Sequence, residues 1–558
     1  MDEPSTGVLT FVKGLRGLLP VPSDYRELRT SWRVDLLSGV TVGIVALPLA
    51  LAFGASSGAG AEAGLITAII GGLVATIFGG SNVQVSGPTG AMVVVLAPVI
   101  ATYGPSVLGL LGIMAGIIVC VCGLFRFGRL VGMIPWPVIE GFTLGIGVII
   151  FMQQVPAALG VADKAGMSSN ALVSAVQSFG RTDWSTAKWT LLVAAIVAAC
   201  MLVGARFNTK VPWSLIGLVA ATLVCVFANL PVASIGELPA GLPAPAFPHL
   251  SLSLLSDLSA PALTVALLAA IESLLSARVA ASHSDTGVLQ ADRELFGQGL
   301  ASIASGLFGG MPATGAIART AVNMSSGART RAAAIVHAIV LFVIVISLGD
   351  IVAKVPLAAL AGVLMVTALR MIHLDLVKRL LTLSKQDALM FIATAVVTVS
   401  VDLIYAVIAG VVIATFLLLR MVSKAAGVHR VPLPEPAEPN DNRIARFKLE
   451  GSLFFAAAER LLQRIEDTRD VSVVIISMSR VRILDSTGAT LLGELITAME
   501  GRGVTVLIEG LQDRHILMAE RTGVTEAVSS SANMAPDKAK AIELARRIVA
   551  WADVEVPE

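Results

Sequence analysis

Two charged residues lie in long apolar stretches, where ionised side chains are rare. Glu272 stands in the middle of an apolar run with Ser276 nearby, and Arg319 follows the glycine- and proline-containing break Gly309–Pro312. Because a charged side chain at membrane depth costs free energy, each is a candidate functional residue. Glu272 is the natural partner of Arg319, and its carboxylate is placed to take up and release a proton. The alternative is a permanent structural ion pair.

A short motif occurs twice in these apolar surroundings. It reads Phe-Gly-Gly, then a proline, then Thr-Gly-Ala at the start of a predicted helix, and its copies span Phe78–Ala91 and Phe308–Ala316. The helix expected after the first copy, from Pro88 to about Ala101, is too short to cross a bilayer alone. Paired segments that are interrupted by glycine and proline are typical of the binding site of a secondary transporter.

Each Thr-Gly-Ala opens a predicted half-helix, whose N-terminus presents unpaired N–H groups and a partial positive charge. Two such ends that face each other can hold an anion. Glycine and alanine let the backbone approach a ligand closely, and the threonines add hydroxyl donors. The alternative is close helix packing through small residues. The candidate anion-binding residues are Thr89, Gly90, Ala91, Thr314, Gly315, Ala316 and, one turn into the second helix, Arg319.

The composition is that of a polytopic membrane protein with room for a soluble domain. The 558 residues are 55% hydrophobic and 14% charged, whereas soluble chains carry about 25% charged residues. The net charge of +1 argues against nucleic acid as a partner. The four cysteines have neither metal-ligand spacing nor a disulfide pattern. No nucleotide, dinucleotide or metal motif indicates an enzyme or a cofactor, so transport would be secondary active or passive.

The apolar runs predict an α-helical protein with fourteen transmembrane segments in two groups of seven. The groups cover about residues 34–230 and 262–422, within a transport domain of about residues 34–425. Besides the repeated motif, a proline followed six residues later by glycine recurs at Pro135 and Pro356. Because seven is odd, the second group must enter from the opposite side, which makes it an inverted repeat.

Loop charge sets the expected orientation, because cytoplasmic loops of membrane proteins are rich in Lys and Arg. Loops after even-numbered spans carry most of the basic residues. We therefore expect a multi-pass protein of the cell membrane, with an N-terminal segment of residues 1–33 and the C-terminus both in the cytoplasm. The basic residues are Arg126, Arg129, Arg206, Lys210, Arg329, Arg331, Lys378, Arg379 and Lys385.

The last part of the chain has a different composition. Residues 426–442 are rich in Pro, Glu and Asn and indicate a linker, and residues 443–558 resemble a soluble domain in composition. Alternating strand and helix patterns predict a small α/β domain there, with a short strand at Val524–Val528. Asp485 or Ser486 is expected to cap a helix that follows a buried strand. The alternative role of Ser486 is to accept a phosphate.

These motifs together resemble those of the sulfate permease (SulP) family of anion transporters, over nearly the whole chain. The region from about residue 443 resembles the STAS domain, named for sulfate transporters and anti-sigma-factor antagonists. Ser486 stands at the position where the antagonists are phosphorylated. The segments that carry the resemblance are Gln84–Gly90, Ile271–Ser276, Phe308–Thr314, Ala318–Thr320, Val355–Leu360 and Asp485–Gly488.

The resemblance implies both a fold and a mode of action. It implies a core domain and a gate domain built from the seven-plus-seven repeat, with an anion between half-helices three and ten. It also implies elevator-type alternating access and a homodimer in the lipid membrane. Substrates across the family include sulfate, bicarbonate, chloride, oxalate and C4-dicarboxylates, and members are proton symporters, sodium symporters or exchangers.

A few positions bear on the coupling ion. Sodium-coupled bicarbonate members resemble this chain around Pro48, a mid-span proline that we include among the candidate substrate-binding residues. These members have an aspartate at the position of Glu272 and a threonine at the position of Ser276. They have no arginine at the position of Arg319. A guanidinium repels sodium, so we expect proton coupling through Glu272, with Ser276 beside it. Sodium-coupled bicarbonate symport, an anion exchanger and a channel remain the alternatives.

Overall fold

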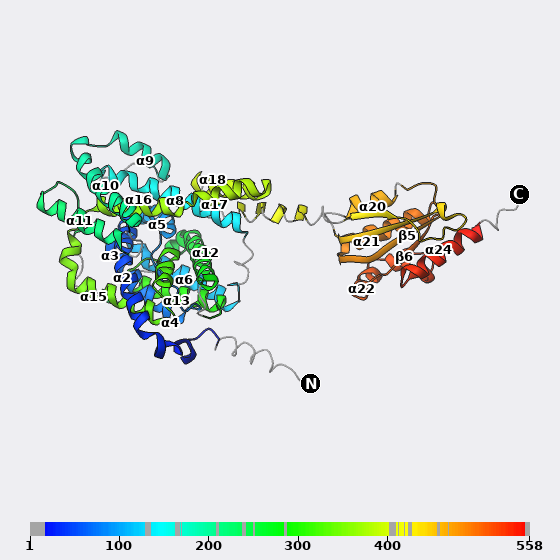
Figure 1. Ribbon diagram of the computed structural model, residues 1–558, viewed down its shortest axis with the longest axis horizontal. Helices are drawn as coiled ribbons and strands as arrows, with labels where there is room; N and C mark the ends of the chain where they lie inside the picture. Colours follow the sequence, from blue (N-terminus) through cyan, green and yellow to red (C-terminus); the bar gives the residue numbers. More distant parts are fainter. Residues whose placement is uncertain are drawn as a thin grey trace. The chain divides into compact units, whose positions relative to one another are not determined.

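The computed structural model divides the chain into two compact units, residues 1–411 and 412–558 (Figure 1). The first unit contains a hydrophobic core of membrane-type helices, and the second contains a core around a sheet. The residues that the structure describes are 17–128, 135–161, 168, 170–207, 211–236, 241–248, 251–283, 287–400, 427–454, 458–466 and 468–552, with some residues between 409 and 421.

The first unit is almost entirely helical in its described part. A two-stranded pair, β1 (Ser86–Gly87) and β2 (Thr314–Gly315), is the exception. The other elements are η1 (Pro22–Tyr25), α2 (Leu28–Ser57), α3 (Ala61–Ile66), η2 (Thr67–Gly71), α4 (Gly72–Phe78), α5 (Gly90–Tyr103), η3 (Pro105–Val107), α6 (Leu108–Leu124), α8 (Trp136–Ala158), α9 (Ala171–Gly180), α10 (Trp184–Phe207), α11 (Trp213–Phe227), α12 (Leu252–His283), α13 (Ala291–Leu307), α14 (Ile317–Ser325), α15 (Ala332–Ala353), α16 (Leu357–Met371), α17 (Leu374–Leu383) and α18 (Lys385–Ser400).

Eight helices among the described residues are long and apolar enough to cross a membrane. Large apolar side chains stay exposed on them, including Leu202 on α10 and Val343 on α15, as on a surface that faces lipid. The total of fourteen spans stays a prediction. Half of the last expected span, Leu403–Val422, lies outside the described residues, and so do Arg129 and Lys210.

Glycines bring α6 and α13 into close contact. A Cβ on Gly299 of α13 would lie 2.5 Å from Sγ of Cys120 and 2.6 Å from the carbonyl oxygen of Gly116, both on α6. A Cβ on Gly306 would lie 2.8 Å from the carbonyl oxygen of Gly109. Small residues at such an interface let two helix backbones approach, which favours their association in lipid. Helix α12, which carries Glu272, packs against both helices.

The two copies of the repeated motif meet in space. Strands β1 and β2 run antiparallel, with Gly87 opposite Thr314. The N–H of Ala316 continues the pairing by donating to the carbonyl oxygen of Val85 at 2.8 Å. The second short helix, α14, therefore begins at Ile317 and not at Thr314 as expected. The reason is that the first residues of the motif are engaged in strand pairing.

The second unit is a five-stranded sheet covered by helices (Figure 1). The strand order is β3-β4-β5-β6-β7, in which β3 is antiparallel to β4 and the other neighbours are parallel. Alternate side chains of β5 serve two cores, one shared with α20 and α21 and the other with α24. The elements are β3 (Gly427–Val431), η4 (Asp441–Arg443), β4 (Ile444–Leu453), α20 (Ala458–Glu466), β5 (Val473–Leu484), α21 (Ser486–Glu500), β6 (Thr505–Glu509), α22 (Asp513–Arg521), α23 (Val524–Ala527), η5 (Ser531–Asn533), β7 (Met534–Ala535) and α24 (Lys538–Ala552).

Two expectations for this unit were wrong. Val524–Ala527 forms the short helix α23 and not a strand, because Gly523 adopts a left-handed conformation that opens a helical turn. The segment 426–442 is more than a linker, because β3 within it pairs with β4. Arg546 of α24 holds a later part of this segment by donating to carboxylate oxygens of Glu438 and Asp441, at 2.6 and 2.8 Å.

A buried ion pair lies inside the sheet. Arg446 of β4 donates to both carboxylate oxygens of Glu509 at 2.8 and 2.7 Å, and Oγ of Ser477 donates to one of them at 2.9 Å. Burial alone would raise the pKa of Glu509, but the hydrogen bonds from Arg446 and Ser477 hold this pKa below its usual value. The stabilisation is therefore present above the unfolded-state pKa of about 4.3 and is lost as the pH falls through the folded-state value.

Replacing Gly299 by alanine should destabilise the first unit, because the added methyl group collides with α6. Overpacking of this kind costs about 1 to 3 kcal/mol, and we expect a lower melting temperature of the purified protein in detergent. Gly349→Ala on α15 is the matched control, since a Cβ there meets nothing within 4 Å. Equal melting temperatures for the two variants would contradict the packing argument.

Replacing Arg446 by methionine should destabilise the second unit by about 3 to 5 kcal/mol, because it leaves the Glu509 carboxylate buried without its partner. The double variant Arg446→Met/Glu509→Leu should recover much of this loss. Hydrogen exchange of β5 and β6 peptides in the whole protein measures the loss of stability in the single variant and its recovery in the double variant. The exposed pair Arg480–Glu450 is the control: Arg480→Met should leave the exchange unchanged. A double variant as unstable as the single one would count against the buried-charge explanation.

Candidate anion-binding site

Glu272 of α12 lies between the threonines of the two motif copies. Its Oε2 accepts hydrogen bonds from Oγ1 of Thr89 at 2.8 Å and from Oγ1 of Thr314 at 3.3 Å. Both threonines are buried, whereas Glu272 is partly exposed. One carboxylate therefore joins the N-terminal end of α5, strand β2 and the middle of α12.

Neighbouring polar groups hold this arrangement in place. Oγ of Ser273 accepts the N–H of Gly315 at 3.0 Å and lies 3.2 Å from Oγ1 of Thr314. The side-chain amide of Gln84 donates to the carbonyl oxygen of Ser273 at 3.3 Å. A Cβ at Gly315 would collide with Nε2 of Gln84. Glycine is therefore required at position 315 so that the side-chain amide of Gln84 can approach the backbone.

Arg319 is almost completely buried, with 1% of its surface exposed. Its Nη2 donates to the carbonyl oxygen of Pro88, and its Nη1 has no hydrogen-bond partner. A Cβ on Gly87 would lie 2.5 Å from Nη1, so glycine lets the guanidinium lie directly against the backbone of the first motif copy. In the described part of the chain, no ion pair joins Arg319 to Glu272. The two charged groups therefore make no direct contact in this structure, and the structural ion pair stays an alternative.

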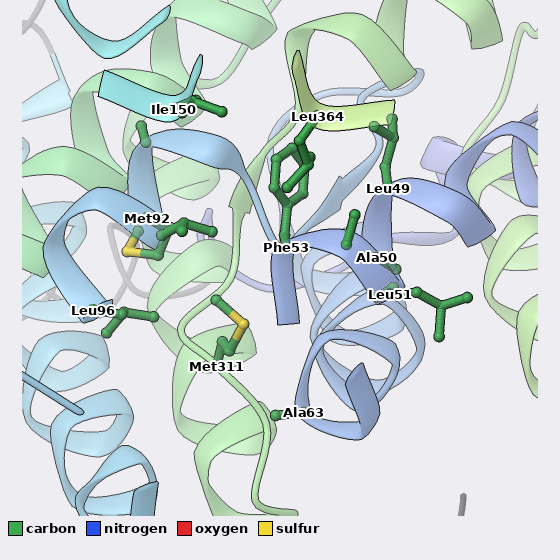
Figure 2. Close-up of a cluster of buried hydrophobic side chains, with 14 of the residues drawn as sticks. Leu49, Ala50, Leu51, Phe53, Ala63, Met92, Leu96, Ile150, Met311 and Leu364 are labelled. Atoms are coloured by element: carbon green, nitrogen blue, oxygen red, sulfur yellow. The ribbon is translucent and has the colours of Figure 1, made fainter. Parts of the chain in front are cut away.

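The N-terminus of α5 follows Thr89 directly and begins at Gly90. The N–H groups of this first turn have no acceptor within the helix and form the positive end of its dipole. The Cα of Gly90 faces an apolar cluster, where a Cβ would lie 3.2 Å from the ring of Phe53 and would collide with Ile150 (Figure 2). Close packing, the alternative considered for this motif, is thus one role of Gly90. Ala91 is buried in the same turn.

In the second motif copy, Gly315 and Ala316 do not offer the free N–H groups that we expected. The N–H of Gly315 is bound to Ser273, and the N–H of Ala316 is bound to the carbonyl oxygen of Val85. Strand pairing uses the N–H of Ala316, and a side-chain hydroxyl uses that of Gly315. The unpaired donors therefore belong to the first turn of α14, which starts at Ile317. Thr314 still faces the site through its hydroxyl group.

Two further candidates lie outside the immediate contacts of Glu272. Oγ of Ser276 donates to Oγ1 of Thr320 at 3.2 Å, and this oxygen also accepts the N–H of Val85 at 3.0 Å. Ser276 therefore ties α12 to α14 and does not bind Glu272. Pro48 is buried in the interior of α2, and its role as a substrate-binding residue stays a prediction.

The sequence interpretation missed a polar stripe on α13. Glu294, Gln298 and Ser302 recur every four residues, and each is at most 2% exposed. Nε2 of Gln298 donates to Oγ of Ser86 at 2.6 Å and to Oε1 of Glu294 at 2.9 Å. Polar residues at positions i, i+4 and i+8 of an apolar helix lie on one face. That spacing is the signal from which a polar face could have been predicted, and Gln298 is the residue of this face that contacts β1.

In the second unit, Asp485 and Ser486 have separate roles. Oδ1 of Asp485 accepts the N–H of Gly488 at 2.7 Å and so caps α21. Ser486 is the first residue of this helix and is exposed. Phosphorylation, the alternative role of Ser486, stays a prediction, and its position at a helix N-terminus is one where a phosphate group is stabilised.

Comparison with known proteins gives consistent results. The sequence pattern of the Sulfate permease family matches residues 32–394, and that of the STAS domain matches residues 436–541. A putative sulfate transporter of Bacillus subtilis, YvdB, is 36% identical over 502 residues, which cover 88% of this chain and 93% of that protein. The bicarbonate transporter BicA of a Picosynechococcus species is 32% identical over 491 residues, which cover 83% and 86%.

A solved structure shares the overall fold. It is murine Solute Carrier 26 family member A9, an anion transporter in the inward-facing state, which matches with a TM-score of 0.83 over 98% of this chain and 96% of that chain, at 18% identity. The relatives named above are transporters and not enzymes. Because the family pattern covers most of the chain and both relatives exceed 30% identity, this protein belongs to the sulfate permease family and carries a C-terminal STAS domain.

Proposed function

We propose that this protein is a secondary active transporter of a small oxyanion or dicarboxylate, and that it moves the anion together with a proton. Relatives named as sulfate and bicarbonate transporters support the substrate class. The observation that carries the proposal is the position of Glu272, whose carboxylate accepts hydrogen bonds from both Thr89 and Thr314. An anion held at the half-helices would meet the same two hydroxyl groups.

A proton on Glu272 and an anion beside it would favour each other's binding. The ionised carboxylate repels an anion and occupies both threonine hydroxyl hydrogens. Once protonated, it has no charge, and it no longer needs both of these donors. By linkage, the anion raises the affinity of the site for the proton by the same factor. This mutual dependence would couple anion uptake to a proton gradient.

Arg319 would supply a fixed positive charge near this site. A buried guanidinium nitrogen without an acceptor, such as its Nη1, is costly. An oxyanion or carboxylate that reached Nη1 would satisfy this donor, and the planar fork of arginine suits such groups. The same charge disfavours a sodium ion. Sodium-coupled bicarbonate symport is the second candidate, and the likeness to the bicarbonate transporter BicA supports bicarbonate as a substrate. An exchanger or channel would not need the proton on Glu272.

We further propose elevator-type alternating access by a homodimer in the cell membrane, with both termini cytoplasmic. The antiparallel pairing of β1 and β2 suits an inverted repeat, because segments related by a two-fold axis in the membrane plane run in opposite directions. The block formed by α6, α12 and α13 would move as one body with the anion. Loop charge supports the orientation.

Glu272→Gln should abolish proton-driven uptake. The amide cannot take up a proton, so we expect at least about a tenfold loss of uphill transport of labelled sulfate, bicarbonate or succinate into liposomes under an inward proton gradient. Wild-type uptake should rise as the outside pH falls, and anion exchange at equal concentrations should persist in the variant. Glu494→Gln, an exposed carboxylate on α21, is the control. A variant that still concentrates an anion with protons would disprove this role.

Arg319→Gln should raise the KM for the anion by about 10- to 100-fold, which is the loss expected for a charge-assisted hydrogen bond of about 1.5 to 3 kcal/mol. Arg319→Lys should be intermediate, because lysine keeps the charge but not the planar fork. The assay runs under an inward proton gradient and then an inward sodium gradient. An unchanged KM would exclude Arg319 from the site, and bicarbonate uptake driven by sodium alone would favour the second candidate.

A further inference from the structure

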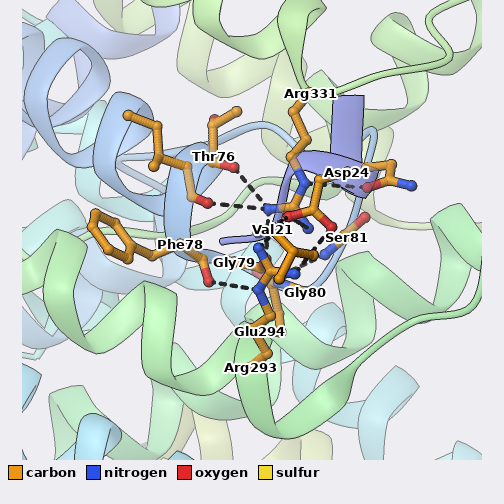
Figure 3. A network of polar contacts seen from close by, with 12 residues as sticks. Val21, Asp24, Thr76, Phe78, Gly79, Gly80, Ser81, Arg293, Glu294 and Arg331 are labelled. Atoms are coloured by element: carbon orange, nitrogen blue, oxygen red, sulfur yellow. Dashed lines mark hydrogen bonds and ion pairs between the residues drawn. The ribbon is translucent and has the colours of Figure 1, made fainter. Parts of the chain in front are cut away.

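Buried charged side chains hold the corner through which the chain enters the candidate site. Helix α4 ends at Phe78, and the corner that follows, residues 78–82, leads to β1. Nη1 of Arg331 donates to the carbonyl oxygen of Gly79 at 2.6 Å, and Nε of Arg293 donates to that of Phe78 at 3.3 Å. These guanidinium groups bind carbonyl oxygens at the C-terminal end of a helix, where positive charge is favoured (Figure 3).

The opposite side of the corner is held by a carboxylate. Oε2 of Glu294 accepts the N–H groups of Gly80 at 2.7 Å and of Ser81 at 3.0 Å. Two arginines therefore bind the carbonyl oxygens of Phe78 and Gly79, and one glutamate binds the N–H groups of Gly80 and Ser81. The backbone adds a bond to the carbonyl oxygen of Gly80 and one from the N–H of Gly79. No regular helix or sheet supplies the bonds from the charged side chains, so the position of the corner depends on these side chains as well.

Both arginines also contact a carboxylate from the N-terminal segment. Oδ2 and Oδ1 of Asp24 lie 2.6 and 3.2 Å from Nη2 and Nη1 of Arg293, and Oδ2 lies 3.9 Å from Nη2 of Arg331 (Figure 3). The side chains of Arg293 and Arg331 are each 2% exposed, and that of Asp24 is 9% exposed. Two buried positive charges are thus balanced by Glu294 and Asp24. Removal of one carboxylate leaves an uncompensated buried charge.

A second acidic residue fixes the N-terminal segment nearby. Oδ1 of Asp35 on α2 accepts the N–H groups of Arg329 and Thr330 at 2.8 and 3.1 Å, directly before Arg331. Asp35 is fully buried. The start of α2, which follows the segment that carries Asp24, is therefore attached to the residues directly before Arg331.

The corner is connected to the site by a short extended stretch. Only residues 83–88 separate it from Thr89, whose hydroxyl group binds Glu272. Along this stretch, Ser86 is bound by Gln298, and the carbonyl oxygen of Val83 accepts Nδ2 of Asn323 at 2.8 Å. The corner and Thr89 are therefore joined by a short stretch whose own contacts are with α13 and α14.

We propose that Asp24 is a positioning residue for the anion site: by balancing Arg293 and Arg331, it fixes the corner and so the reach of Thr89 to Glu272. The inference rests on the proposed function of that site, and it extends the site to the N-terminal segment. Asp24 does not touch the substrate. It acts through the backbone of residues 78–89.

The contact of Asp24 with Arg293 and Arg331 does not act as a pH switch near neutrality. Burial raises the pKa of Asp24, but the hydrogen bond from Arg293, with the charges of Arg331 and Arg293, brings this pKa below its usual value. The stabilisation is present above the unfolded-state pKa of about 3.9 and is lost only as the pH falls below it. Asp24 therefore stays ionised throughout the pH range in which a proton gradient would be applied.

The test compares Asp24→Asn, Asp24→Glu and the control Glu27→Gln in the full-length protein. Glu27 is exposed, and its side chain makes no capping bond. Hydrogen exchange without substrate should rise about tenfold in peptides covering residues 79–89 of Asp24→Asn, with peptides of α10 unchanged. The KM for the transported anion should rise about three- to tenfold, with a smaller change in kcat. Asp24→Glu should restore part of both values.

A charge-balanced variant sharpens the result. Asp24→Asn combined with Arg293→Gln removes one charge of each sign, although it also removes the bond from Arg293 to the carbonyl oxygen of Phe78. If the uncompensated buried charge is the main cost, this variant should exchange more slowly over residues 79–89 than Asp24→Asn alone. Exchange at these residues equal to wild type, or raised equally in all peptides with an unchanged KM, would overturn the proposal. If the wild type moves no anion, the proposed function fails. The exchange experiment then still decides whether Asp24 positions the corner.

Discussion

The shared carboxylate of Glu272 is the interaction on which the rest of the first unit depends. One oxygen binds the hydroxyl groups of Thr89 and Thr314, which come from segments more than two hundred residues apart in the sequence. Those segments can meet only because β1 and β2 pair as strands and because Ser273 and Gln84 fill the space around Gly315. The hydrogen bonds of this carboxylate therefore depend on the positions of both half-helices.

Rigid packing around this point gives the site its shape. Glycines on α6 and α13 place the two helices in contact, and the polar stripe of α13 reaches β1 through Gln298. The corner after α4 is fixed by Arg293, Arg331 and Glu294. An anion that enters would exchange its water for hydroxyl groups and helix N–H groups already in position, which reduces the reorganisation needed on binding.

Much of the fold was readable from the sequence, because apolar length and repeated glycine-proline breaks report directly on membrane helices and half-helices. The sequence also placed Glu272 and Arg319 near the motif copies. It could not show that strand pairing uses the N–H of Ala316 and that the hydroxyl of Ser273 accepts the N–H of Gly315. Two-residue strands leave no periodic pattern, and both acceptors lie far away in the sequence. The role of Asp24 was equally hidden, since its partners Arg293 and Arg331 lie hundreds of residues away.

The central claim is that a proton on Glu272 and an anion bind together. The most direct measurement is proton uptake by the purified protein in weakly buffered detergent solution when the transported anion is added. We predict the uptake of about one proton per anion bound at neutral pH, and none in Glu272→Gln although the anion still binds. Anion binding without proton uptake by the wild type would contradict the account.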